Sequence, residues 1–445
     1  MRTTLRLLML PLGAVLLLGG IEFFGSENGG APVAAASLPK PGFGPANFAE
    51  AQRDVAAQLS LARERAARRP DDWLVQASLA RALMAQSSLT GGYAMLEEAQ
   101  RVAALANDLA PEQSGHMLVA AYTAMGAHRL DAVKEALDRF ALKVVPAAAD
   151  EQAEVLGLRG DLAFYQGDLQ AATRLYAEAR ILNPSPGTVY RQALLAKARG
   201  EFERAEGLFR EALAADASPT PRTVADIAVQ LGALDQAQGD YSAARAHFIE
   251  ADRLFPGFWL YESHVAQVDY LTGRESEALV RLEAMLAQGE QPVEVTELYA
   301  LLLQSEGRDA ESRRWSARAT AIWDERLEAM PEAAYGHAIE HHFKFGSADR
   351  ALELARRNLA ERPYGEARLL LAEALLATGD PAGALAQMRR ARRDGWLSAP
   401  HLRAEVNALE ALGRRDEARA VRSDAEAINP HVFDPVSEFV WFSHG

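Results

Sequence analysis

Small and apolar residues recur along this chain in a pattern that is typical of paired amphipathic helices, and the copy around Gly239 shows it most fully. A first helical stretch contains Leu231 and Gly232, a turn follows at Gly239, and a second stretch carries small and aromatic residues at helical spacing. A glycine after a helix supplies a left-handed end, and a proline stops the helix that follows. The second stretch contains Ala244, Phe248 and Ala251 and closes at Pro256. The pattern therefore predicts a helix hairpin.

The turn glycine of this hairpin recurs at near-constant intervals. Eight glycines are spaced by 33, 39, 34, 34, 39, 33 and 34 residues, and in seven copies an alanine stands five residues later. A period of this length indicates an array of helical repeats. The copy at Gly307 departs most, with Ser312 and Ser316 in place of the alanine and the aromatic residue, and its second helix is predicted to extend to about Met330. The glycines are Gly167, Gly200, Gly239, Gly273, Gly307, Gly346, Gly379 and Gly413.

These residues resemble the tetratricopeptide repeat, whose 34-residue signature has a Leu-Gly pair, an alanine, an aromatic residue, an alanine and a terminal proline in this order. The resemblance covers roughly residues 70 to 430. It implies an all-α fold, a right-handed superhelical solenoid of about ten antiparallel helix pairs. No sheet is expected, because alternating runs of β-branched residues are absent. The resemblance also implies that the first helix of each pair lines a concave face.

The N-terminal 36 residues have the pattern of an export signal. Arg2 and Arg6 precede an apolar run over residues 7–21, and alanines at positions 34–36 offer a cleavage site. The run is shorter than the roughly 20 residues that span a bilayer. Residues 1–36 are therefore predicted to be either a cleaved signal peptide or an N-terminal membrane anchor. Both alternatives place the remainder in the periplasm of a bacterium, secreted or anchored to the inner membrane.

The rest of the chain divides into three segments. Residues 37–46 are rich in glycine, proline and alanine and are predicted to be a flexible linker. Residues 47–430 are predicted to be the repeat domain, which begins with a capping helix from Asn47, its N-cap, to about Arg68. Residues 431–445 are an apolar tail, for which two alternatives stay open. It folds onto the last hairpin as a cap, or it docks on another protein.

The amino-acid composition excludes several classes of ligand and of catalytic site. With 47 basic and 61 acidic residues, the net charge of −14 argues against a nucleic-acid ligand, because phosphate binding requires a basic surface. The chain has no cysteine, which removes disulfides, thiol catalysis and thiolate metal sites. The sequence contains neither a glycine-rich phosphate loop nor a serine elbow. We therefore predict that the protein is not an enzyme and needs no cofactor.

Polar and aromatic side chains on the first helices are the candidates for partner binding. On the concave face that the resemblance implies, most of them are acidic, and Lys197 and Arg403 are basic exceptions. Such a groove is predicted to attract a basic or amphipathic segment of another protein. The alternative is a solvated helix face with no dedicated ligand. The candidates are Glu154, Asp161, Asp226, Gln236, Tyr270, Glu294, Glu297, Glu340, Phe343 and Glu373.

Two histidines suggest a second kind of site. His337 and His341 are four residues apart on a predicted helix, so that both imidazoles lie on one face and can share a metal ion. No third ligand follows at a diagnostic spacing, and a packing role is the alternative. Taken together, the sequence predicts a non-catalytic protein-binding scaffold of the cell envelope. Its rival is a metal-handling accessory protein that uses this histidine pair.

Overall fold

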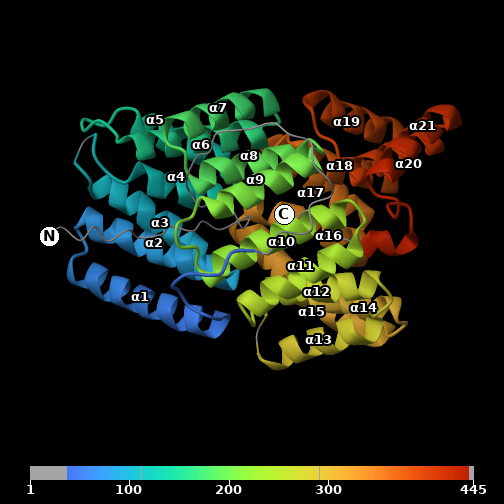
Figure 1. The fold of residues 1–445 in the computed structure, drawn as a ribbon, viewed down its shortest axis with the longest axis horizontal. Helices are drawn as coiled ribbons and strands as arrows, with labels where there is room; N and C mark the ends of the chain where they lie inside the picture. The colour runs from blue at the N-terminus through green and yellow to red at the C-terminus, as the bar shows by residue number, and fades with distance from the viewer. Residues whose placement is uncertain (1–37, 112, 290, 440–445) are drawn as a thin grey trace.

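The computed structural model describes residues 38–111, 113–289 and 291–439, and all regular structure in these ranges is helical. Helix α1 (Phe48–Arg68) packs on the next helix, and ten hairpins of consecutive helices follow it (Figure 1). A short 3-10 helix, η1 (Pro435–Phe439), comes last. The described chain is thus an all-α solenoid of tetratricopeptide-like hairpins, as predicted. The hairpins are α2 (Trp73–Thr90) with α3 (Tyr93–Leu109), α4 (Met117–Gly126) with α5 (Leu130–Phe140), α6 (Ala149–Tyr165) with α7 (Leu169–Leu182), α8 (Pro186–Ala198) with α9 (Phe202–Ala214), α10 (Pro221–Ala237) with α11 (Tyr241–Leu254), α12 (Trp259–Leu271) with α13 (Glu275–Ala287), α14 (Val293–Ser305) with α15 (Asp309–Ala329), α16 (Pro331–Phe345) with α17 (Ala348–Glu361), α18 (Gly365–Ala377) with α19 (Pro381–Asp394), and α20 (Ala399–Ala411) with α21 (Arg415–Ile428).

Two predictions about single helices are confirmed. Helix α1 follows Asn47, whose side chain accepts a 2.9 Å hydrogen bond from the backbone N–H of Glu50, and it ends at Arg68. Helix α15 extends to Ala329 and is longer than the second helices of the other hairpins. Its buried Ser312 donates a 2.8 Å hydrogen bond to the carbonyl of Ala300, so the hydroxyl that replaces the usual alanine has a partner. Trp323 supplies a fully buried aromatic ring further along this helix.

The backbone conformation of the hairpin turns depends on a glycine and on the residue after it, which caps the second helix. Gly239 has a φ of 81°, in the left-handed region that glycine adopts without strain. Asp240 then caps the second helix, accepting a 2.9 Å hydrogen bond from the backbone N–H of Ala243. Gly346 is the exception among the eight repeat glycines, because its φ is −112° and Ser347 caps the next helix. The left-handed turn predicted for that copy is therefore wrong.

Close approach within a hairpin depends on glycines that face aromatic rings. A Cβ atom on Gly232 of α10 would lie 2.6 Å from the ring of Phe248 on α11. A Cβ on Gly160 of α6 would lie 2.3 Å from the ring of Tyr176 on α7. Both rings are buried. The two helices can therefore pack at this distance only because the first helix has no side chain at the crossing.

We expect Gly232→Ala to lower the free energy of unfolding by about 1–3 kcal/mol, because the added methyl group overlaps the Phe248 ring in a packed core. Gly207→Ala is the matched control. Gly207 also lies inside a helix, α9, but no described atom lies within 4 Å of its added carbon, and the change should stabilise by about 0.5–1 kcal/mol. Urea unfolding followed by circular dichroism measures both variants. Equal unfolding midpoints would contradict this packing.

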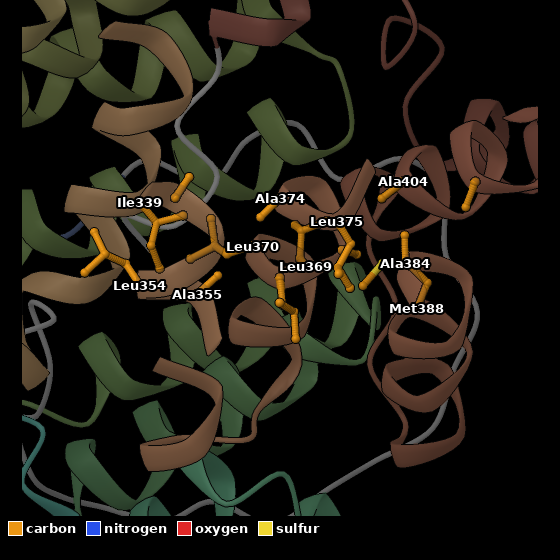
Figure 2. Packing of buried hydrophobic residues seen from close by; sticks show 14 of the residues in the cluster. Ile339, Leu354, Ala355, Leu369, Leu370, Ala374, Leu375, Ala384, Met388 and Ala404 are labelled. Atoms are coloured by element: carbon orange, nitrogen blue, oxygen red, sulfur yellow. The ribbon is translucent and has the colours of Figure 1, made fainter. Parts of the chain in front are cut away.

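The first helix of each hairpin forms an inner layer. Helix α10 has 11 buried residues, whereas its partner α11 has four. In the second half of the chain, buried side chains join neighbouring hairpins. Figure 2 shows them as a continuous row from Ile339 of α16, through Leu370 and Leu375 of α18, to Met388 of α19. Each hairpin therefore buries its apolar face against its neighbours, as in other repeat arrays.

The solenoid closes on itself after about six hairpins. The turn of the third hairpin lies against the loop before α18, so that a Cβ atom on Gly167 would be 2.7 Å from the carbonyl oxygen of Pro363. The next turn is joined to the loop before α20 by a 3.0 Å hydrogen bond from the N–H of Leu397 to the carbonyl of Ala198. Helices α8 and α9 accordingly lie beside the helices of the second half in Figure 1. The equivalent contacts further along are Gly200 with Leu397 and Gly239 with Asn429.

Both ends of the described chain lie against the array. In the segment before α1, the N–H of Gly42 donates a 2.6 Å hydrogen bond to the carbonyl of Pro219. After α21, Val432 is fully buried, and the Ser437 hydroxyl lies 3.4 Å from the hydroxyl of Tyr241. Residues 1–37 and 440–445 lie outside the described residues, so the signal or anchor, the segment boundaries and the role of the apolar tail stay predictions. Within the described ranges, no helix has the length and apolar character needed to cross a membrane.

Candidate functional site

The predicted groove residues lie on the inner helices, but two of the carboxylates bind a buried arginine. Arg191 of α8 is 1% exposed, and its Nη2 lies 2.7 Å from Glu154 Oε1. Its Nε lies 3.1 Å from Asp161 Oδ2. The hydroxyl of Tyr176 donates a 2.8 Å hydrogen bond to Asp161, and that of Tyr122 donates to Glu154. These side chains form a closed internal network that joins three hairpins.

The ionisation of this network follows from the balance of burial and charge. Burial opposes the charge of Glu154, but the Arg191 charge and its hydrogen bond outweigh burial and hold the pKa of Glu154 below its ordinary value. Burial prevails at Asp161 and raises its pKa. The pKa of Arg191 is raised well above the ordinary value, because the two carboxylates more than offset its burial. Arg191 therefore stays charged and is the element on which both acids depend.

The other three acidic candidates of the first seven hairpins also have internal partners. Asp226 accepts a hydrogen bond from the Tyr261 hydroxyl and lies 3.7 Å from the Arg222 guanidinium. The remaining two interact with residues of α15 and α16. Glu294 lies 3.2 Å from Arg326, and Glu297 accepts a 3.0 Å hydrogen bond from the indole N–H of Trp323. Five of the predicted groove carboxylates thus have partners inside the protein, and four of them join one hairpin to another, whereas Glu294 binds Arg326 of its own hairpin.

The three uncharged candidates differ in their access to solvent. Gln236 is buried, and its Nε2 donates a 3.4 Å hydrogen bond to Gln267. Tyr270 and Phe343 are partly buried, each packed against the edge of a hydrophobic core. Gln236 therefore links α10 to α12, whereas the two aromatic rings retain an exposed part that a partner could contact.

The last two acidic candidates belong to a mixed-charge group that we call the seam cluster: Lys197, Glu340, Glu366, Glu373 and Arg403. Lys197 comes from α8 in the first half of the chain, and the other four come from α16, α18 and α20. Closure of the solenoid brings them together. Arg403 Nη2 lies 3.6 Å from Glu373 Oε1, and Glu340 Oε2 lies 3.6 Å from His337 Nδ1. These side chains are partly exposed, unlike Arg191.

Burial dominates the electrostatics of the seam cluster. It raises the pKa of Glu366 to about 7, although the charge of Lys197 acts in the opposite direction. Burial likewise lowers the pKa of Lys197 to about 8 against the charge of Glu366. The pKa of Glu373 is raised by burial, with Arg403 opposing and Glu340 adding to the rise. The raised pKa values of Glu366 and Glu373 indicate that nearby cations do not fully offset burial, so an added cation would stabilise the charged form of both carboxylates.

Aromatic rings join the two halves of the chain next to this cluster. The Tyr165 ring of α6 is 5.2 Å from that of Tyr364, and the Phe164 ring is 5.1 Å from that of Trp396, between centroids. Tyr364 and Trp396 are themselves 5.8 Å apart. Such pairs favour this geometry and add to the apolar area they bury. They hold the seam cluster in place.

The histidine pair has neighbours of other kinds. His341 is fully buried, with Nε2 at 2.8 Å from the Thr320 hydroxyl and Nδ1 at 3.3 Å from Glu297. The ring of His337 stacks on Trp323 at 5.5 Å. Burial would lower the pKa of His337, but the hydrogen bond to Glu340 and nearby glutamates raise it. Within the described ranges, no three His, Cys, Asp or Glu side chains are arranged to hold a metal ion. Both histidines contact α15, His341 through Thr320 and His337 through Trp323.

Sequence reasoning missed the internal partners of the acidic candidates. For Asp226 a signal was present, because Arg222 lies four residues earlier on the same helix, a spacing at which side chains meet. Arg191 and Arg326 lie on helices other than those of their carboxylates. No spacing rule connects residues on different helices, so these pairs could not be read from the repeat pattern.

The similarity of this chain to known proteins is found in structure rather than in sequence. No protein-family model matches it, and no curated protein matches it in sequence. A tetratricopeptide repeat protein from Parabacteroides merdae is 16% identical with a TM-score of 0.34, over 58% of this chain and 99% of that protein. TTC0263, a thermophilic TPR protein of Thermus thermophilus, is 19% identical with a TM-score of 0.32, over 45% and 98%. A monomeric mutant of IFIT1 with Gppp-AAAA is 16% identical with a TM-score of 0.45, over 78% and 77%.

Proposed function

We propose that this protein is a non-catalytic scaffold of the bacterial cell envelope that binds an amphipathic segment of another protein at the seam cluster. Helical repeat arrays generally present extended inner surfaces to protein partners. One observation favours the seam cluster as the binding site. Glu340 and Glu373 have 26% and 32% of their side chains exposed and gather with Glu366 on the inner helices. Of the five other acidic candidates, four are at most 13% exposed, and Glu154, at 24%, accepts hydrogen bonds from Arg191 and Tyr122.

The chemistry of the seam cluster favours an amphipathic rather than a purely basic segment. Lys197 and Arg403 already supply positive charge, so the surface is of mixed sign. Basic side chains of the partner would face Glu366 and Glu373, whose raised pKa values show that burial is incompletely compensated. Apolar side chains of the same segment would contact Phe343, which lies three residues after Glu340 on α16. Placement in the envelope rests on the export pattern of residues 1–36.

Photo-crosslinking in intact cells tests this proposal. A photoreactive residue in place of Phe343 is expected to capture an envelope protein, and neutral Glu340→Gln, Glu366→Gln and Glu373→Gln substitutions together should reduce capture about tenfold or more, because desolvated charge pairs contribute strongly to binding. The control neutralises exposed carboxylates of the outer helices, Glu353→Gln with Asp416→Asn, and should leave capture unchanged. Undiminished capture by the triple variant would refute the seam cluster as the site. Capture of cytoplasmic proteins alone would refute the location.

A further inference from the structure

Each hairpin of the solenoid has a turn at one end and a loop to the next hairpin at the other. Turns and loops of different hairpins contact each other in one part of the array, and in the rest the described residues provide no such contact. We call the hairpin turns the turn rim and the loops between hairpins the loop rim. In the closed part of the array, the turns at Gly167 and Gly200 lie on the loops at Pro363 and Leu397. The contact between the rims is therefore the way in which this protein stacks one superhelical turn on the next.

The turn rim of the last hairpins has no such cover among the described residues. A Cβ atom built on any of four repeat glycines there would meet no described atom within 4 Å. Leu412, beside one of these turns, is among the exposed large apolar residues. This part of the rim has the same turn geometry as the covered part, since φ of Gly379 is 85° and that of Gly167 is 78°. The four glycines are Gly273, Gly307, Gly379 and Gly413.

Among the described residues, the loop rim of the second and third hairpins has large apolar side chains that are exposed. In the loop between α5 and α6, Leu142, Val144 and Val145 are 65%, 68% and 71% exposed, and Ile181 at the end of α7 is 82% exposed. A 3.2 Å hydrogen bond from the N–H of Val144 to the carbonyl of Gln113 holds the first loop in shape. Apolar side chains gathered on a shaped surface indicate an interaction site. In Figure 1 this loop and α21 lie on opposite sides of the molecule.

We propose that a second copy of this chain docks its loop rim, at Leu142, Val144, Val145 and Ile181, on the turn rim around Gly379 and Gly413 of the first. The partner is inferred to be a second copy because turns and loops of this kind already pair with each other inside the molecule. The turns at Gly167 and Gly200 lie on the loops at Pro363 and Leu397, and the free turns and loops have equivalent positions in their hairpins. The contact is heterologous, so every added copy again presents a free rim and the chain assembles head to tail. Burial of the apolar loop side chains drives the association.

Disulfide trapping tests the assembly, since the chain has no cysteine of its own. Full-length Val145→Cys and Leu412→Cys chains with different tags are expressed together and oxidised in the cell. A mixed disulfide dimer is expected at more than tenfold the yield obtained when Asp424→Cys, an exposed position toward the other end of α21, replaces Leu412→Cys. Equal yields from the two pairs would overturn the proposal, as would trapping of a different protein by the Val145→Cys chain.

Substitutions on the exposed loop supply the second measurement. Leu142→Glu with Val144→Glu, added to the Val145→Cys chain, should abolish the mixed dimer without unfolding the protein, because both side chains point into solvent. Val280→Glu is the control, since Val280 is also 65% exposed but lies on α13. Docking through this rim would be contradicted if the mixed dimer persisted in the loop variant. It would also be contradicted if the Val280→Glu control lost the dimer as well. Capture at the seam cluster is a separate readout and is expected to be unaffected.

Discussion

Replacement of Arg191 by methionine is expected to lower the free energy of unfolding by about 3–5 kcal/mol, because it leaves the Glu154 and Asp161 carboxylates without their buried counter-charge. Water cannot take over the role of the guanidinium, since Arg191 is 1% exposed. Methionine fills a similar volume, so the loss reports charge rather than an empty cavity. Urea unfolding followed by circular dichroism measures the effect.

Two further variants identify the cause of this loss. Glu154→Gln and Asp161→Asn, added to Arg191→Met, should restore most of the stability, because no uncompensated charge then remains inside the protein. Arg419→Met removes an arginine whose ion pair with Asp416 is solvent-exposed, and it should change stability by no more than about 0.5 kcal/mol. If Arg191→Met and Arg419→Met had the same effect, the buried network could not have the role described above.

Gly167→Ala is expected to destabilise the protein by about 2–4 kcal/mol through two causes. A side chain is strained at φ of 78°, and the added carbon would lie 2.7 Å from the Pro363 carbonyl oxygen, which belongs to a rigid backbone. The second effect forces the two superhelical turns apart. We therefore expect a larger radius of gyration by small-angle X-ray scattering, together with a lower unfolding midpoint.

Gly273→Ala separates these two causes. Gly273 has a φ of 75°, but no described atom lies within 4 Å of the added carbon, so backbone strain of about 1–2 kcal/mol is the whole expected cost. Its radius of gyration should equal that of the unchanged protein. An identical response of the two variants would show that the contact between Gly167 and Pro363 does not hold the solenoid closed.

Local signals were sufficient to predict the helices and most turns. A glycine followed by a capping aspartate marks the turn at Gly239, and Asn47 marks the start of α1, because caps and left-handed turns depend on residues next to one another in the chain. Gly346 is the repeat glycine for which the predicted left-handed turn is wrong. It occupies the same place in the repeat, yet its backbone is not left-handed: α16 continues to Phe345, the residue directly before it, whereas α10 ends at Ala237, two residues before Gly239.

The candidate site was predicted less completely. Helical spacing placed Glu154, Glu297 and Glu373 on inner helices, but it did not indicate which of them would have partners inside the protein. Arg191 accounts for Glu154, and the indole of Trp323 with His341 accounts for Glu297. Glu373 retains partial exposure beside Arg403. Partners on different helices depend on the angle between hairpins, which a repeat pattern does not contain.

The amino-acid sequence by itself determined the repeat, the hairpins and the inner position of the first helices, because these depend on contacts within about 34 residues and on one amphipathic pattern repeated along the chain. Only the tertiary structure decided that the solenoid closes on itself, that Lys197 of α8 meets Glu366 of α18, and which repeat glycines lie against no other described residue. Small rotations between neighbouring hairpins accumulate over about six repeats before Gly167 meets Pro363. The sum of those rotations depends on side-chain packing at every interface, and the repeat signature does not record it.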